Sequence, residues 1–329
     1  MVIGFFGCFG VGSLSKEYNP FVFQRHIAIL RPNEKVLPAF LYYTMLSKDF
    51  YAKADAVALG AAQRTVSLTS LRNIRIELPP VETQNRIVSI LSAYDDLIEN
   101  NQRQIKLLEE AAQRLYKEWF VDLRFPGHEH TAIVDGVPEG WEKDSIDSRI
   151  SLLSGYAFKS AQFDSSGEYK IVTIKNVKDG EFDGINTSRM MSIPDKMPKH
   201  CILAEGDILL SLTGNVGRTC IVSGNNFLLN QRVAKLQSGI PAFTYCLFRN
   251  SDMFDAMNNL ANGAAQQNLS PIRTGKITIL FPSDDLLADF EIIAGSIIHN
   301  MLILIRQCNL LIQARDRLLP KLMSGEMEV

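Results

Sequence analysis

Two long stretches of this sequence carry apolar residues at alternating steps of four and three positions. The first stretch runs from Ile87 to Leu115, with Asn101 in the one place that is not apolar, and the second runs from Phe290 to Leu318. Such steps form the heptad pattern of a coiled coil, so each stretch predicts a long helix with an apolar seam. The seam residues expected to pair are Ile87, Leu91, Tyr94, Ile98, Asn101, Ile105, Leu108, Leu115, Ile297, Met301, Leu304, Leu311 and Leu318.

The two helical stretches belong to a longer internal repeat. Gly60–Gln63 recurs as Gly263–Gln266, and the same offset of 203 residues relates Ile74 to Ile277. A period near 200 residues is far too long for a solenoid repeat, so it indicates a duplicated domain. Two matched seams in one chain favour an intramolecular coiled coil between the two helices, in which an antiparallel pairing would place the two domains at opposite ends. The simpler alternative is that each seam is the buried face of an ordinary helical domain.

Short β-forming runs alternate with turn clusters between the two predicted helices. The runs are Tyr169–Val177, Ile202–Leu212 and Arg232–Leu236, whereas Ala242–Asn259 has the composition of a helix. These patterns predict the α+β class, with a β-rich core in each repeat. The glycines and prolines from Arg124 to Gly140 predict a linker.

Composition narrows the class of protein without identifying it. The chain has 329 residues, of which 46% are hydrophobic and 21% charged, so a wholly disordered chain is excluded. The net charge is −2, yet residues 149–250 contain 12 Lys and Arg against 8 Asp and Glu. None of the five cysteines lies in a C-x-x-C pair, which favours a reducing cytoplasm over a zinc site or disulfides. The apolar stretch Met301–Ile312 is too short and too polar to predict a membrane span.

The motif search predicts nucleic-acid contacts more readily than catalysis. The glycines of residues 4–12 resemble a phosphate loop, but no Lys-Ser/Thr pair follows them, and the histidines have no metal-ligand spacing. Lys and Arg can neutralise phosphates, and Arg, Asn and Gln can contact base edges. Ordinary surface polarity is the alternative for each candidate. The candidates are Lys159, Lys175, Asn176, Arg218, Arg232, Gln266 and Gln267.

Five short motifs follow one another in a fixed order along the chain. They are Val137–Glu142, Ser154–Ser160, Gly206–Ser211, Thr213–Gly217 and the terminal Leu318–Glu326. With this order and the duplication, essentially the whole chain resembles the specificity (S) subunit of type I restriction–modification systems. The resemblance implies two target-recognition domains joined by an antiparallel helical spacer. Each domain would read one half of a split sequence in double-stranded DNA, and the spacer length would set the gap.

The same resemblance implies partners and a division of labour. Modification subunits would bind S-adenosylmethionine and methylate adenine, and a restriction subunit, an ATP-dependent endonuclease and translocase, would cleave DNA. The chain itself would hold no cofactor and no metal, would carry no catalytic residues, and would not act at a membrane. The expected divisions are a partial first recognition domain (1–81), a first spacer helix (82–120), a linker (121–140), a second recognition domain (141–283), and a second spacer helix with its tail (284–329).

The beginning of the chain departs from this pattern. Because 141 − 203 is −62, the counterpart of Trp141 would fall before residue 1. We therefore expect a first domain without its opening strands and with an unsatisfied sheet edge. Three explanations stay open: a truncated gene product, a misplaced start codon, or one half of a split recognition domain that another chain completes. Two alternatives remain open for the function. One is a helical scaffold that holds two partners without reading DNA, and the other is the recognition module of a methyltransferase.

Overall fold

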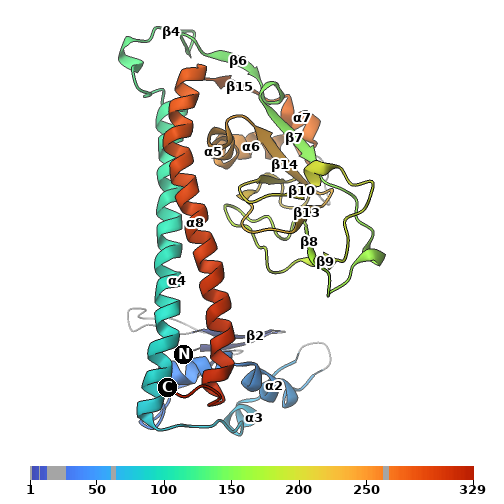
Figure 1. Cartoon of the computed structure of the whole chain (residues 1–329). Coiled ribbons are helices and arrows are strands. Elements are labelled where there is room, and N and C mark those ends of the chain that lie inside the picture. The colour runs from blue at the N-terminus through green and yellow to red at the C-terminus, as the bar shows by residue number, and fades with distance from the viewer. Residues whose placement is uncertain (1, 7, 13–26, 61–63, 262–266) are drawn as a thin grey trace. The chain divides into compact units, whose positions relative to one another are not determined.

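The computed structural model describes residues 2–6, 8–12, 27–60, 64–261 and 267–329, with the backbone alone for residues 2–12 (Figure 1). The chain divides into two compact units, residues 1–101 with 307–329 and residues 102–306. Each unit contains one β-rich domain and one part of each long helix. The units are described one at a time.

The first unit contains a small antiparallel sheet and three short helices. β1 (Val2–Phe6) lies between β2 (Cys8–Gly12) and β3 (Ile27–Ile29). The short helices are α1 (Pro38–Leu46), α2 (Lys48–Ala56) and α3 (Leu68–Arg72). The long helix α4 (Val81–Tyr116) begins directly after Pro79-Pro80 and continues into a π-helical turn at Lys117–Val121. Proline disfavours helix in the residue before it, which is why α4 begins at this point.

The second unit contains two four-stranded sheets. One has the order β12-β11-β14-β7 and the other the order β10-β13-β8-β9. The strands of the first sheet are β7 (Ile150–Ser154), β11 (Ile208–Ser211), β12 (Thr219–Ile221) and β14 (Val233–Ser238). Those of the second are β8 (Tyr169–Val172), β9 (Ser188–Met190), β10 (Ile202–Leu203) and β13 (Phe227–Leu229).

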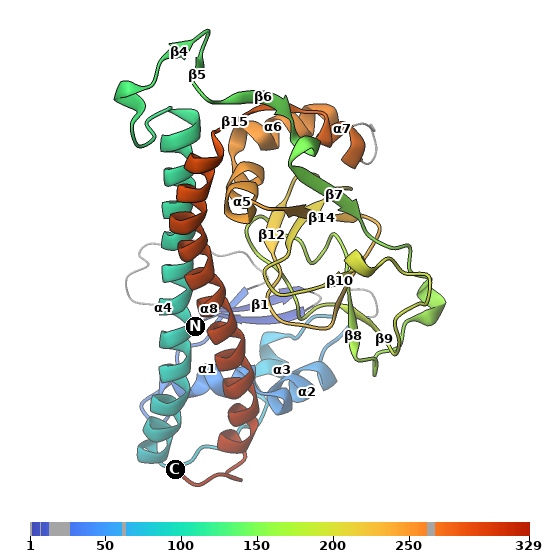
Figure 2. The same cartoon turned by 45° about the horizontal axis from the view of Figure 1, so that its top comes forward.

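Two two-stranded sheets and several helices, besides the last part of α4, complete the described part of this unit. β4 (Ile133–Val134) pairs with β5 (Val137–Pro138), and β6 (Glu142–Ser145) pairs with β15 (Thr278–Phe281). The helices are α5 (Pro241–Arg249), α6 (Ser251–Leu260), α7 (Pro271–Gly275) and the first part of α8 (Asp284–Met323). Helix α5 lies between the sheet that contains β12 and β14 and the two long helices (Figure 2).

The structure reproduces the duplication element by element. Helices α5, α6, α7 and α8 begin 203 residues after α1, α2, α3 and α4. Even a helix cap repeats, because the hydroxyls of Ser67 and Ser270 each accept a hydrogen bond from the backbone N–H three residues later. The sheet order β2-β1-β3 matches β12-β11-β14, and β7 is the additional fourth strand of the second copy. The predicted α+β class with a duplicated domain is confirmed.

The helix and strand boundaries predicted from local composition were less accurate than the duplication predicted from the repeat. The helix expected over Ala242–Asn259 is two helices, because Asn250 adopts an extended conformation (ψ 141°) and its side chain caps α6. The run Ile202–Leu212 is likewise divided between β10 and β11. Gly206, at φ +92°, forms the turn between them, a backbone conformation that glycine adopts readily.

Helices α4 and α8 pair in antiparallel fashion, which confirms the coiled coil predicted from the matched seams and the direction implied by the resemblance. In the first unit Asp95 of α4 forms an ion pair with Arg315 of α8 at 2.6 Å. In the second unit Tyr116 of α4 and Phe290 of α8 share one core cluster, with ring centroids 6.3 Å apart. The predicted seam residues are all buried or half-buried: Ile87, Leu91, Tyr94, Ile98, Asn101, Ile105, Leu108, Leu115, Ile297, Met301, Leu304, Leu311 and Leu318.

Helix α8 is long and apolar enough to cross a membrane by length and composition alone. Its most apolar 18-residue window has a mean hydropathy of 1.6, and 22% of that window is buried. A core helix with an apolar seam also meets these two criteria of length and composition. Phe290, Ala294, Met301 and Cys308 form such a seam, since all four are buried.

Asn101 is a polar residue within the seam and provides a test of its role there. Its side chain is 3% exposed, and its Nδ2 donates to Oε1 of Gln307, which is itself exposed, at 3.3 Å. We expect Asn101→Leu to raise stability by about 1 kcal/mol, because a buried amide is exchanged for an apolar side chain and Gln307 returns to water. Thermal unfolding followed by helical circular dichroism measures this effect. The matched control is Asn100→Leu, at an exposed neighbour, and an equal change in both variants would contradict the prediction.

Candidate nucleic-acid interface

Backbone hydrogen bonds bring together three turns of the second unit that lie far apart in the sequence. The N–H of Leu212 donates to the carbonyl of Arg232 at 3.0 Å, and the N–H of Gly214 donates to the carbonyl of Gln267 at 3.0 Å. The N–H of Leu269 returns to the carbonyl of Leu212 at 2.7 Å. The turn at residues 213–217 therefore lies between Arg232 and Gln267, two residues that we predicted from the sequence to contact DNA.

A fourth turn, residues 173–176 after β8, joins this region through β13. Asn230 donates its N–H to the carbonyl of Val172 at 3.0 Å, which brings the end of β13 beside the end of β8. Lys175 is exposed at the tip of this turn, and the part of the chain that the structure describes offers it no ion pair. The cation of Lys175 is thus available to a ligand.

Asn176 has a structural role, and its predicted contact with DNA is wrong. Its side chain is 1% exposed. Its Oδ1 accepts hydrogen bonds from both the N–H and the hydroxyl of Thr173 at 2.9 Å, and its Nδ2 donates to the carbonyls of Asp183 and Asn186 at 2.8 and 2.9 Å. An amide with these four bonds has no capacity left for a base. Asn176 fixes the turn that presents Lys175.

Lys175 and Arg232 face a common depression of about 720 Å³. Its lining contains these two cations and three amide side chains, and it contains no carboxylate, so its charge is positive. Amides can both donate to and accept from base edges, and the two cations can approach phosphates or guanine. The lining residues are Thr173, Ile174, Lys175, Ile185, Asn186, Thr187, Ser188, Asn230, Gln231 and Arg232.

The other predicted residues lie outside the lining of this depression. Arg218 is half-buried after the 213–217 turn, where its N–H donates to the hydroxyl of Ser211 at 3.0 Å. Lys159 is exposed at the start of a short 3-10 turn, and Gln267 is exposed beside Gly214. Gln266 lies outside the described residues. Lys159, Arg218 and Gln267 belong to the same unit as Lys175 and Arg232 but do not line the depression.

The sequence analysis did not identify three other residues that line the depression, Asn186, Thr187 and Ser188. Asn186 ends the cluster Gly184-Ile185-Asn186, which has the composition of a turn, and this stretch contains no basic residue that would mark it as a DNA-contacting site. Asn186 is exposed, and its Nδ2 donates to Asp183 at 2.9 Å, so the loop is internally braced. The available signal was the amide itself in a turn within a locally basic domain.

A glycine in one of the sequence motifs is explained by close packing in this region. Tyr156 forms a bridge with Asn230, and Gln231 donates its N–H to the carbonyl of Tyr156 at 3.0 Å. A Cβ on Gly155 would lie 2.3 Å from the carbonyl oxygen of Asn230. Only glycine permits the two backbones to approach this closely. The motif Ser154–Ser160 therefore supports one wall beside the depression.

Comparison with known proteins identifies the class of molecule that this fold and surface define. The family model described as "Type I restriction modification DNA specificity domain" matches residues 4–110 and 138–286. The chain belongs to this family, which confirms the class predicted from the sequence, a non-catalytic specificity subunit. The two matched segments correspond to the two copies of the duplicated unit. The family is consistent with a chain that carries no cofactor of its own.

Particular relatives extend the similarity over almost the full chain. The type I restriction enzyme MjaIX specificity subunit of Methanocaldococcus jannaschii is 23% identical over 97% of this chain and 76% of its own length. The HindI specificity subunit of Haemophilus influenzae is 22% identical over 95% and 83%. The crystal structure of a type I S subunit from M. genitalium has the same fold, with a TM-score of 0.53 at 17% identity over 88% of this chain and 73% of that one.

Proposed function

We propose that this chain is the DNA sequence-recognition subunit of a type I restriction–modification complex in the cytoplasm. It reads a split target in double-stranded DNA and positions modification and restriction subunits, which bind S-adenosylmethionine and ATP. The observation that supports this proposal is the depression that holds Lys175 and Arg232 together with three amides and no carboxylate. Such a surface suits one half of a split target, because its cations approach phosphates while its amides reach base edges.

The residues of this surface have distinct expected roles. Lys175 and Arg232 provide the electrostatic contact, and Asn186, Asn230 and Gln231 provide hydrogen-bonding groups at the base edges. The hydrogen-bonded core of the turns, including Asn176, holds these groups in place before DNA arrives. Because the scaffold is fixed by backbone bonds, a change in the exposed side chains changes recognition without changing the fold.

A methylation library provides the direct test. The chain is assembled with its modification subunits and incubated with duplexes that contain every combination of two short half-sites at several gaps. We expect methylation to depend on sequence at both half-sites, and we expect Gln231→Ala to relax the preference at one of them. Lys143→Ala, an exposed residue on β6 outside the depression, is the matched control and should keep the preference. Methylation without preference at the half-site affected by the second unit would refute the proposal.

A further inference from the structure

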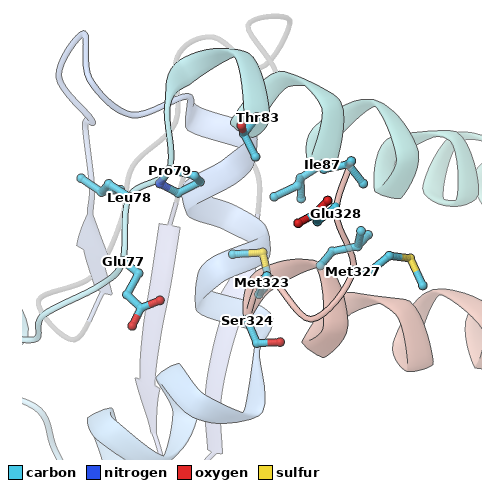
Figure 3. Close-up of a pocket in the computed structure, with 12 residues that line it drawn as sticks. Glu77, Leu78, Pro79, Thr83, Ile87, Met323, Ser324, Met327 and Glu328 are labelled. Carbon is cyan, nitrogen blue, oxygen red and sulfur yellow. The ribbon is translucent and has the colours of Figure 1, made fainter.

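The depression of the second unit and a groove of the first unit differ in charge. The groove has a volume of about 500 Å³, and its described lining contains the carboxylates of Glu77 and Glu328 and no lysine or arginine. Figure 3 shows Glu77 and Pro79 on one side of this groove and Met323 on the other. Carboxylates repel phosphates, so of these two hollows only the depression, whose described lining carries cations and no carboxylate, suits DNA.

A short hairpin connects two of the three segments that line the depression. These two segments are residues 173–175, which precede the hairpin, and residues 185–188, which follow it. Val177 and Phe182 form an antiparallel bridge that closes the hairpin. We name residues 177–182 the connecting hairpin. The separation of the two lining segments depends on where this hairpin lies.

The base of the connecting hairpin is bonded directly to the lining of the depression. Oδ1 of Asp183 accepts hydrogen bonds from the N–H groups of Ile185 and Asn186, each at 3.1 Å. Nδ2 of Asn176 donates across the base to the carbonyls of Asp183 and Asn186. A displacement of the hairpin would therefore move the residues that line the depression.

The tip of the connecting hairpin is held by an arginine of α5. Arg249 forms an ion pair with Asp179 through Nη1, and the N–H of Gly180 donates to the carbonyl of Thr219 on β12 at 2.9 Å. Gly180 has a φ of +75°, and a Cβ at this position would lie 3.0 Å from Nη2 of Arg249. The tip is thus packed on the guanidinium group, in a backbone conformation that glycine adopts readily.

Arg249 is itself fixed, whereas Asp179 is largely exposed. Nε of Arg249 donates to Glu109 of α4 at 2.9 Å, and these two side chains are only 15% and 16% exposed. The side chain of Asp179 is 65% exposed. An exposed carboxylate contributes little to folding stability even when it is paired. The contact of Asp179 with Arg249 therefore determines the position of the hairpin more than the stability of the unit.

We propose that Asp179 and Arg249 are a positioning pair, which fixes the connecting hairpin against α5 and so sets the shape of the depression that reads DNA. This role rests on the function proposed above and adds to it two residues outside the described lining of the depression. Groups that are held in place before binding discriminate better between ligands. Loss of the pair should weaken the fit to preferred bases more than the attraction to phosphates that every sequence shares.

A DNA titration compares two carboxylates of the same hairpin. The chain in complex with its modification subunits is titrated with its preferred duplex and with a random duplex. We expect Asp179→Ala to lower the ratio of the two affinities by about fivefold or more, with affinity for the random duplex unchanged within a factor of about two. The matched control is Glu181→Ala, because Glu181 pairs with Lys178 inside the hairpin at 2.7 Å and both side chains are exposed. This control, and the conservative Asp179→Glu, should keep the wild-type ratio.

Hydrogen exchange tests the positioning role without DNA. In the hairpin the N–H groups of Gly180 and Asp183 donate to the carbonyls of Thr219 and Asn176. These two amides should exchange about tenfold faster in Asp179→Ala and at the wild-type rate in Glu181→Ala. The melting temperatures of both variants should agree within about 2 °C, because each loses an exposed carboxylate.

The possible outcomes separate this role from the proposed function. Wild-type exchange in Asp179→Ala, or a wild-type affinity ratio in that variant, would overturn the positioning role alone. A lower melting temperature of Asp179→Ala than of Glu181→Ala, beyond that margin, would assign the pair to stability and would also overturn it. A wild-type complex without preference for any duplex would refute the proposed function, and the positioning role with it.

Discussion

Glu109→Ala is expected to lower the free energy of unfolding of the second unit by about 3 kcal/mol. Glu109 lies on α4, and its Oε1 accepts a hydrogen bond from Nε of Arg249 at 2.9 Å while its Oε2 accepts one from the hydroxyl of Tyr245 at 2.6 Å. Burial and then the Glu109 carboxylate raise the pKa of Tyr245 well above its usual value, so this tyrosine remains a hydrogen-bond donor. This network attaches α5, and with it the β-rich domain, to α4.

The size of the effect follows from burial. Tyr245 is 0% exposed, and the side chains of Arg249 and Glu109 are only 15% and 16% exposed. Removal of the carboxylate leaves a buried hydroxyl and a largely buried cation without their partner, which costs several kcal/mol in comparable pairs. Arg249 retains an ion pair with Asp179, which keeps the expected loss at the lower end of that range.

Tryptophan fluorescence measures this unit selectively, because the only two tryptophans, Trp119 and Trp141, both belong to it. A loss of about 3 kcal/mol should lower the melting temperature by roughly 6–12 °C for a unit of this size. The matched control is Glu110→Ala, since Glu110 pairs with Arg114 only at 4.0 Å and with both side chains exposed. That change should cost less than about 0.5 kcal/mol. Equal melting temperatures for the two variants would contradict the role assigned to Glu109.

The first unit uses the same chemistry at a different place. The hydroxyl of Tyr43 on α1 donates to Asp95 of α4 at 2.7 Å, and Asp95 also accepts from Arg315 of α8 at 2.6 Å. In both units, a tyrosine on the first helix of the domain meets a carboxylate of α4 that also binds an arginine. The residues are not related by the 203-residue offset, so the duplication conserved the backbone while the anchoring pairs differ between the copies.

The repeat and the seam could be predicted because both depend on periodicity. An offset of 203 residues is visible in identities such as Gly60–Gln63, and heptad spacing follows directly from helical geometry. Helix and strand boundaries could not be predicted as well, since they depend on single capping residues. Asn250 looks like one polar residue within a helix, whereas it ends α5 and caps α6.

The candidate surface was only partly predictable because composition does not report burial. Asn176 and Lys175 are neighbours with similar polarity, yet one is 1% exposed with its amide satisfied and the other is exposed. The bonds of Asn176 to Asp183 and Asn186 depend on how a later loop folds back, which no local pattern contains. The proximity of Lys175 to Arg232 likewise depends on the parallel pairing of β8 with β13.

Loss of DNA affinity in Lys175→Ala and Arg232→Ala is the second large effect that we expect. Each cation lines the depression, and the loss of a phosphate or base contact should weaken specific binding by about 1–3 kcal/mol, or roughly 5- to 150-fold. Each lost phosphate contact should also reduce the slope of log K against log salt by about one. The measurement is a titration of the preferred duplex by the chain in complex with its modification subunits, at several salt concentrations.

Three further alanine variants distinguish the loss of a DNA contact from other causes of weakened DNA binding. They are Arg218→Ala, Lys143→Ala and Asn176→Ala. Arg218 is half-buried outside the depression, and we expect its loss to weaken binding less than the loss of Arg232. Lys143→Ala removes an equal charge on β6 and should leave affinity unchanged. Asn176→Ala should instead reduce stability by about 1–3 kcal/mol, because it leaves buried backbone carbonyls without donors. Unchanged DNA affinity in the alanine variants of Lys175, Arg218 and Arg232 would contradict the assignment of this surface.

Arg232→Lys distinguishes a base contact from a phosphate contact at the same position. Lysine keeps the charge but lacks the planar pair of donors that binds guanine in a bidentate manner. If Arg232 reads a base, the variant should retain binding to random DNA and lose at least tenfold of its preference for the cognate duplex. If Arg232 contacts only phosphate, affinity for both duplexes should stay within a factor of about three. Because Arg232 lies beside the amides of Asn230 and Gln231 in the depression, we expect the first result.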